Sequence, residues 1–236
     1  MSVPIKLASF VGKIIAIDGP AGSGKSTTAK ALAKRLGYTF LDTGAMYRAV
    51  ALFALRNGLS FDDGNALTQI AAKVKIEFKS DEIKGQLVLL NGEDVTEAIR
   101  TPEATRGSSA VAVHAGVRKE MVLRQQNMAR KGSIVAEGRD TTSVVFPRAD
   151  LKVYLTANLK TRARRRFLEA VHRGENTTIE EQEKLVLDRD MNDSNRKESP
   201  LLQVKEAVVV DTTGLSIDEQ VETIIHLARK AFSMGQ

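Results

Sequence analysis

The sequence of 236 residues has no cysteine and no tryptophan, and only three histidines. Without cysteine there can be no disulfide and no thiolate metal site. His114, His172 and His226 lie far apart in the chain, in no metal-ligand spacing, so we interpret them as structural or surface residues. Aromatic residues make up 5% of the chain. This scarcity argues against base stacking along single-stranded nucleic acid, because that mode of binding needs aromatic platforms.

Long apolar runs are also missing. No stretch approaches the roughly 20 apolar residues that a membrane helix needs, and the initial "MSVPIKLASFVGK" lacks a signal-peptide pattern. We therefore expect a cytoplasmic protein without a membrane partner. The 42% of hydrophobic residues is enough for one sizeable core, and the net charge of +6 suits an anionic partner such as a phosphorylated small molecule.

Apolar runs alternate with helical patterns along most of the chain, which indicates an α/β fold with a parallel sheet covered on both faces. One segment, residues 74–96, breaks this rhythm. Residues 74–79 and 86–96 alternate at a period of two and predict an antiparallel hairpin, whereas the polar segment 162–185 predicts two exposed helices around Gly174. The expected strands are 13–19, 38–42, 133–138, 151–157 and 207–213, and the expected helices are 25–36, 44–58 and a last one ending near Phe232.

The segment "GPAGSGKS" (19–26) lies between a predicted strand and a predicted helix and matches G-x-x-x-x-G-K-[ST]. Its glycines allow backbone N–H groups to turn toward phosphate oxygens. We expect Lys25 to reach the β- and γ-phosphate oxygens of a nucleoside triphosphate, and the Ser26 hydroxyl to bind Mg²⁺. The predicted triphosphate-binding residues are Gly19, Ala21, Gly22, Ser23, Gly24, Lys25, Ser26 and Thr27.

The phosphate loop occurs in several classes of protein. The guanine-reading N-K-x-D segment of regulatory GTPases is absent, and motor and transport ATPases usually need a larger core. A small phosphotransferase is therefore favoured. The alternative from another class is a basic nucleic-acid-binding ATPase, because "RARRR" (162–166) fits either a lid over a triphosphate or a nucleic-acid patch.

Polar groups follow two further strands. Thr43 and Arg48 lie in the first turns of the helix after the second strand. Arg139 and Asp140 follow an apolar strand at the carboxyl edge of the sheet, where ligands of parallel sheets bind. Arg139 offers a planar fork suited to phosphate, although a turn that merely pairs Arg with Asp fits the same residues.

The segment "RDMNDSNR" (189–196) places Arg189, Asp193 and Arg196 at relative positions 0, 4 and 7. In a helix, these three side chains share one face. That face is either a solvated surface, as most charged helix faces are, or a row of groups that binds a ligand.

Five segments together resemble the bacterial cytidylate kinases, which phosphorylate CMP and dCMP with ATP: "GPAGSGKS", "LDTGAMYRAVA", "LNGEDVTEAIRTPE", "EGRDTTSVVFPRADLKVYLTA" and "DRDMNDSNRKESPL". The resemblance implies the P-loop nucleoside monophosphate kinase fold, with three layers around a five-stranded parallel core sheet, an inserted antiparallel substrate-binding subdomain and a short lid. The implied layout is a single domain over 1–236 with a core of 13–60, 106–157 and 196–236, an insertion of about 61–105 and a lid of about 158–190. UMP or shikimate kinases are the nearest rivals.

The resemblance also implies roles for individual residues, with ATP and Mg²⁺ on the donor side, CMP or dCMP as the acceptor, no nucleic-acid partner and a monomer. Lys25 and the lid arginines Arg162, Arg165 and Arg166 are the implied catalytic residues. The implied acceptor site has Arg48, Arg139 and Arg196 on the phosphate with Thr43 close by, Arg189 and Asp193 on the ribose, and Ser109, Arg118 and Asp140 on the base.

The sequence departs from the family pattern at one place. After the Arg139-Asp140 pair the family commonly has an apolar residue, then Gly and Thr, whereas this chain has Thr141, Thr142 and Ser143. Both suspected contact residues are retained. The backbone that follows them is the part of the site that the resemblance does not predict.

Overall fold

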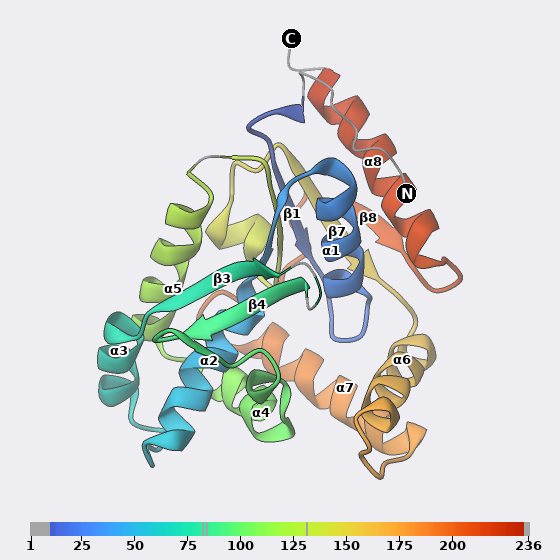
Figure 1. Ribbon diagram of the computed structural model, residues 1–236. Helices are drawn as coiled ribbons and strands as arrows, with labels where there is room; N and C mark the ends of the chain where they lie inside the picture. The colour runs from blue at the N-terminus through green and yellow to red at the C-terminus, as the bar shows by residue number, and fades with distance from the viewer. Residues whose placement is uncertain (1–9, 82, 84, 131, 234–236) are drawn as a thin grey trace. The chain divides into compact units, whose positions relative to one another are not determined.

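The computed structural model describes residues 10–81, 83, 85–130 and 132–233. The chain divides into two compact units, residues 1–41 with 128–236, and residues 42–127. Figure 1 labels the elements of both. Among the described helices, none is long and apolar enough to cross a membrane.

A five-stranded sheet forms the centre of the first unit. The chain passes into the second unit at the end of β2, between Leu41 and Asp42. The strand order is β2-β6-β1-β7-β8, and β1 pairs in parallel with both β6 and β7, as β7 does with β8. The α/β class and the parallel core sheet are thereby confirmed. The strands are β1 (Ile14–Asp18), β2 (Thr39–Asp42), β6 (Ile134–Glu137), β7 (Leu151–Thr156) and β8 (Val208–Asp211).

Helices α1 and α8 pack side by side against this sheet, as the blue and red helices of Figure 1 show. Ile15 and Ile17 of β1, Leu32 of α1 and Ile224 of α8 are fully buried in the resulting core. Each such side chain contributes about 1.5–3 kcal/mol on burial. The helices of this unit are α1 (Lys25–Leu36), a π-helix (Thr141–Val145), α6 (Leu159–His172), α7 (Ile179–Asn195) and α8 (Ile217–Ser233).

The strand register brings three connecting segments to one edge of the sheet. Ile17 of β1 is opposite Glu137 of β6, and Asp18 is opposite Tyr154 of β7. The phosphate loop after β1, the turn after β6 and the segment that leads from β7 into α6 therefore all start at the same edge. In open parallel sheets this carboxyl edge is where ligands bind.

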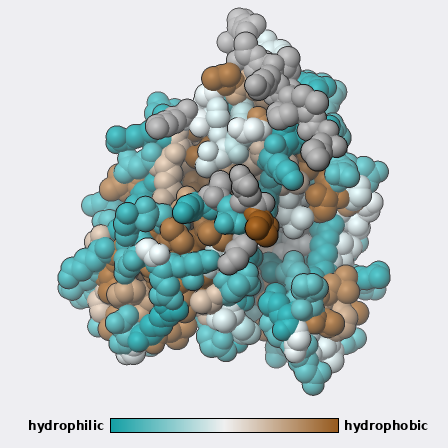
Figure 2. All heavy atoms as spheres, in the orientation of Figure 1, coloured by the Kyte–Doolittle hydropathy of each residue, from teal (hydrophilic) through white to brown (hydrophobic). Residues whose placement is uncertain are grey.

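Helices α6 and α7 pack against each other, with Gly174 at a φ of +79° between them. The two predicted helices around Gly174 are thus confirmed. A capping box starts α7: the Thr178 hydroxyl accepts from the Glu181 N–H, and the Glu181 carboxylate accepts from the Thr178 N–H. The face in Figure 2 is mostly hydrophilic, with hydrophobic residues over α6, where Leu168 and Val171 are exposed.

The second unit contains the predicted antiparallel hairpin, formed by β3 and β4. Its second strand is shorter than the predicted 86–96, because β4 ends at Leu90 and residues 93–94 form a separate short strand, β5, that pairs with β4. The first helix of this unit, α2, starts at the Asp42 carboxylate, which accepts a 2.8 Å hydrogen bond from the Ala45 N–H. Helices α3, α4 and α5 were not predicted from the sequence. The elements are α2 (Thr43–Arg56), α3 (Gly64–Lys73), β3 (Ile76–Asp81), β4 (Gly85–Leu90), β5 (Glu93–Asp94), a 3₁₀ turn (Ala98–Arg100), α4 (Pro102–Val111) and α5 (Ala115–Met128).

Candidate functional site

The phosphate loop connects β1 to α1 and requires glycine at two positions. Gly24 has a φ of +94° and is the N-cap of α1, with no side chain capping the first turn. Gly22 has a φ of +74°, and a Cβ there would lie 2.8 Å from the carbonyl oxygen of Arg162. Because the first N–H groups of a helix carry partial positive charge, this loop and helix start are suited to phosphate.

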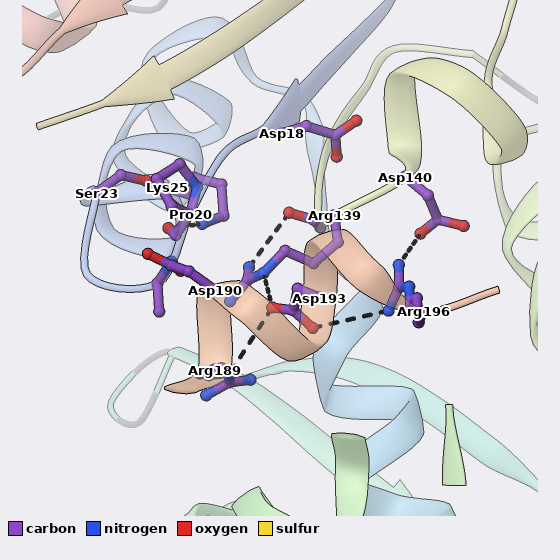
Figure 3. Close-up of polar contacts among 12 residues, drawn as sticks. Asp18, Pro20, Ser23, Lys25, Arg139, Asp140, Arg189, Asp190, Asp193 and Arg196 are labelled. Carbon is purple, nitrogen blue, oxygen red and sulfur yellow. Dashed lines mark hydrogen bonds and ion pairs between the residues drawn. The ribbon is translucent and has the colours of Figure 1, made fainter. Parts of the chain in front are cut away.

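Lys25 is the first residue of α1, and only 5% of it is exposed. Its Nζ donates to the carbonyl oxygen of Pro20 at 2.7 Å and to the Ser23 hydroxyl at 3.4 Å (Figure 3). Burial lowers the pKa of Lys25, as does the nearby Arg139, while Glu137 opposes that shift. A cation in so dry a position interacts with phosphate more strongly than one in water.

The Ser26 hydroxyl donates a 2.6 Å hydrogen bond to Oε1 of Glu137, the last residue of β6. Sequence reasoning placed Glu137 at the strand end but assigned it no role. Its place immediately before Gly138 and Arg139, at the carboxyl edge, was the available signal. No group of three or more His, Cys, Asp or Glu side chains that could hold a metal ion occurs within the described residues.

Asp193 on α7 is surrounded by arginines (Figure 3). Arg139 Nε donates to its Oδ2 at 2.6 Å, while Arg189 Nε and Arg196 Nη1 lie 4.0 and 3.8 Å from its carboxylate oxygens. Arg196 Nη2 is also 4.0 Å from Oδ1 of Asp140. Helix α7 ends at Asn195, so Arg196 is the C-cap residue and reaches Asp193 from just outside the helix.

Burial distinguishes this cluster from an ordinary charged helix face. The Asp193 and Arg196 side chains are 7% and 8% exposed, so the interpretation as a solvated face is wrong. Burial alone would raise the pKa of Asp193, but Arg139 and then Arg189 outweigh it and hold the pKa below its ordinary value. With three guanidinium groups around two carboxylates, the cluster keeps a surplus of positive charge for an anionic ligand.

The sequence pattern of the family described as "Cytidylate kinase" matches residues 15–230. The chain belongs to the cytidylate kinase family. The "Cytidylate kinase" of Ligilactobacillus salivarius (strain UCC118) is 48% identical over 213 residues, covering 90% of this chain and 95% of that protein. That of Geobacillus sp. (strain WCH70) is 46% identical over 216 residues, covering 92% of this chain and 96% of the relative.

The fold also matches a solved structure of low sequence similarity. An uncharacterized protein from Eubacterium ventriosum ATCC 27560 aligns with a TM-score of 0.51 at 13% identity, covering 92% of this chain and 98% of that one. This likeness concerns the fold alone.

The three arginines that family resemblance assigns to the lid have different surroundings. Arg162 is buried; its Nε donates to Ala157 O and its Nη1 to Ala21 O, each at 3.0 Å, and it pairs closely with Asp190. Arg165 donates to Gly22 O at 3.3 Å and Thr212 O at 2.7 Å. Arg166 pairs with Glu169 at 2.8 Å, and its side chain is 36% exposed. Their catalytic roles stay predictions.

Asp190 of α7 is a residue that sequence reasoning missed. Its Oδ1 accepts a 2.9 Å hydrogen bond from the backbone N–H of Ala21, and its Oδ2 pairs with Arg162. One carboxylate thus links α7, α6 and the phosphate loop. The signal was weak, because Asp190 stands between Arg189 and Met191 and off the face that holds the arginine row.

The remaining predicted residues of the cytidylate kinase site belong to the second unit. Arg48 pairs with Asp42 at 2.8 Å, and Thr43 is buried at the start of α2. Arg118 is buried on α5 and lies over the ring of Tyr47, with its guanidinium carbon 5.5 Å from the ring centroid. Ser109 is half-buried on α4. Their assignment to the acceptor remains a prediction.

Asp193 yields a prediction about stability and pH. Because its folded-state pKa is below the ordinary 3.8, its pairs stabilise the protein above about that pH, and this stability is lost as the pH falls through the lowered pKa. We expect Asp193→Asn to lower the free energy of unfolding by about 3 kcal/mol at pH 7, because the substitution leaves buried arginines without their anion. The measurement is urea unfolding between pH 7 and pH 3.

The difference between Asp193→Asn and the parent should shrink toward the acid end of that series. Asp188→Asn is the matched control, since Asp188 lies exposed on the same helix. A difference that stays constant with pH, or an equal effect of the control, would show that ionised Asp193 does not stabilise the fold.

Proposed function

We propose that this protein transfers the γ-phosphoryl group of ATP to CMP or dCMP, giving CDP or dCDP and ADP. The observation that carries the proposal is that one unit of a cytidylate kinase family member holds both a phosphate loop with buried Lys25 and a cationic cluster around Asp193. We further propose that the protein acts in the cytoplasm on small nucleotides, as a monomer.

The donor side is assigned to the phosphate loop and Lys25. The terminal γ-phosphorus of ATP is attacked in line by an oxygen of the acceptor phosphate, and the bond to the bridging oxygen of ADP breaks. Because the acceptor oxygen is already ionised near neutral pH, no protein group has to remove a proton. Catalysis then depends on alignment and on cancelling negative charge. Lys25 supplies a fixed positive charge for this purpose.

Mg²⁺ fits the oxygen donors at the start of α1, because hard divalent cations bind hydroxyl and carboxylate oxygens. We assign Ser26 as the residue that holds the ion, with Glu137, 2.6 Å from its hydroxyl, as the neighbouring carboxylate. When bound, Mg²⁺ neutralises charge on the phosphate oxygens.

The acceptor side is assigned to Arg139, Asp140 and the α7 row. Arginine guanidinium groups bind phosphate in a planar, bidentate geometry, which suits Arg139 and Arg196 to the acceptor phosphate. Arg189 and the Asp193 carboxylate suit ribose hydroxyls, which both donate and accept. The Asp140 carboxylate suits the N4 amino group of cytosine. From the second unit, Arg48 is assigned to the phosphate and Ser109 with Arg118 to the base, by family resemblance.

We assign α6 as part of the lid over the triphosphate. We propose that Arg162 and Arg165, which contact the backbone of the phosphate loop, stabilise charge on the transferred group and that Arg166 assists them. Closure of such a segment excludes water and limits wasteful hydrolysis of ATP.

The test is a coupled assay of ADP release with Mg·ATP across CMP, dCMP, UMP, AMP and GMP. We expect CMP and dCMP to give the highest kcat/KM, with UMP lower by about 100-fold. A folded preparation that transfers phosphate to neither CMP nor dCMP would refute the proposal. Tight, salt-sensitive RNA retention in a filter-binding assay, without kinase activity, would select the nucleic-acid-binding ATPase instead.

A further inference from the structure

Asp18, the last residue of β1, is fully buried and has a complete set of donors. Its Oδ1 accepts from the N–H of Thr141 at 2.9 Å and from the hydroxyl at 2.6 Å. Its Oδ2 accepts from the N–H of Thr142 at 2.7 Å and from that hydroxyl at 2.6 Å. A buried carboxylate is tolerated when it is bonded in this way. We refer to Asp18, Thr141 and Thr142 as the Asp18 clamp.

The Asp18 clamp closes one end of a two-residue turn. At the other end, the Gly138 N–H donates to Ile17 O at 3.0 Å and continues the ladder between β6 and β1. Arg139 and Asp140 are therefore held between two attachments to neighbouring residues of one buried strand, Ile17 and Asp18. Figure 3 shows both side chains extending from this turn toward α7, with Asp18 at the end of β1.

The two hydroxyls of the clamp come from the segment where this sequence departs from the family pattern. A glycine in place of Thr142 has no hydroxyl, and it allows the backbone at that position a wider range of φ and ψ angles. Here the hydroxyls bond to the carboxylate, and the segment 141–145 forms a π-helix whose Val144 and Val145 N–H groups donate to Asp140 O at 2.9 and 3.1 Å. The bonds at Asp18 and at the Asp140 carbonyl together define the position of the turn.

We propose that the Asp18 clamp positions Arg139 and Asp140 for the acceptor nucleotide, so that Asp18, Thr141 and Thr142 are positioning residues of the kinase reaction. The clamp contacts neither reacting group; it acts through the turn. A rotation of the turn would shift Arg139 relative to Asp193, 2.6 Å away, and Asp140 relative to Arg196 at the same time. This inference rests on the proposed assignment of Arg139 and Asp140 to CMP.

The decisive variant is the double substitution Thr141→Val/Thr142→Val, which removes both hydroxyls while keeping both backbone N–H groups and nearly the same volume. We expect KM for CMP to rise about tenfold, because misplaced binding groups lose affinity and alignment. KM for ATP should change by less than about twofold, since the clamp hydroxyls bond to Asp18 and not to the phosphate loop. Thr141→Ser/Thr142→Ser keeps the hydroxyls and should restore the parent KM.

Ser143→Ala is the matched control. Ser143 belongs to the same π-helix, and its buried hydroxyl has no hydrogen-bond partner among the described residues. The control should therefore keep both KM values. The parent must phosphorylate CMP for the comparison to be made, and its failure to do so would count against the proposed function, not against the clamp.

A double variant that has a lower Tm but the parent KM for CMP would overturn the proposal and leave the clamp a purely structural feature. An equal rise of KM for ATP would overturn it too. If the double variant does not fold, the two single valine variants take its place, each with an expected rise of about threefold in KM for CMP. Unchanged KM values in both would again overturn the proposal.

Discussion

Replacement of Lys25 by alanine is expected to lower kcat for ATP-dependent phosphorylation of CMP by about 10³-fold. Lys25 is 5% exposed and donates to Pro20 O at 2.7 Å within the phosphate loop. A preorganised cation in a dry site is worth several kcal/mol where charge develops, and removing one such group typically costs about 10²–10³ in kcat. The measurement is steady-state ADP release with Mg·ATP and saturating CMP.

Stability should respond to Lys25→Ala in the opposite direction. Burial lowers the pKa of Lys25, which means that the folded protein disfavours the charge at this position. Removing a desolvated cation relieves that cost, so Tm is expected to stay the same or rise while activity is lost. Substitution of functional residues often raises stability while it lowers activity in this way.

Lys30→Ala is the control for Lys25→Ala, because Lys30 is also a lysine on α1 but is exposed to solvent. It should retain parent activity. Near-normal turnover in Lys25→Ala, or a comparable loss in Lys30→Ala, would contradict the role assigned to Lys25.

Replacement of Asp140 by alanine is expected to reduce the preference for CMP over UMP by about 100-fold. A carboxylate accepts a hydrogen bond from the N4 amino group of cytosine, whereas the uracil carbonyl at that position would face it as a second acceptor. An unpaired buried polar group of this kind can cost several powers of ten in selectivity. Most of the change should come from a lower kcat/KM for CMP. The measurement is kcat/KM for both nucleotides.

Asp140→Asn refines the Asp140 experiment, because an amide can donate to the uracil carbonyl as well as accept. It should raise UMP use above that of the alanine variant. Asp188→Ala, an exposed site on α7, serves as the control and should keep the parent ratio. An unchanged CMP/UMP ratio in Asp140→Ala would reject its role in reading the base.

Several parts of the fold and site were predictable because their signals are local. The strands of the core sheet are short apolar runs bounded by turns, and the hairpin of β3 and β4 alternates with a period of two. The phosphate loop is a contiguous motif, so its glycines, Lys25 and Ser26 could be named directly. Helix α5 was not predicted because its apolar residues do not gather on one face. Helices α3 and α4 were not predicted either, although their apolar residues do gather on one face.

The pairing of Arg139 with Asp193 could not be predicted from local sequence patterns. The sequence placed Asp193 and its arginines on one helix face, but whether that face met solvent or a ligand depended on burial. Arg139 reaches Asp193 from 54 residues away in the chain. The π-helix after Asp140 could not be foreseen either, because a departure from a family pattern indicates that the backbone differs without indicating how.

The sequence by itself determined the α/β class, the phosphate loop and the family resemblance, because these depend on residues close together in the chain or on motif identity. Only the tertiary structure decided which charges are buried and what pairs with them. Asp18 meets Thr141 across 123 residues, and Asp190 reaches Ala21 across 169. Such pairs form because parallel strands bring their carboxyl ends to one edge, where buried carboxylates must find donors from whichever segments arrive there.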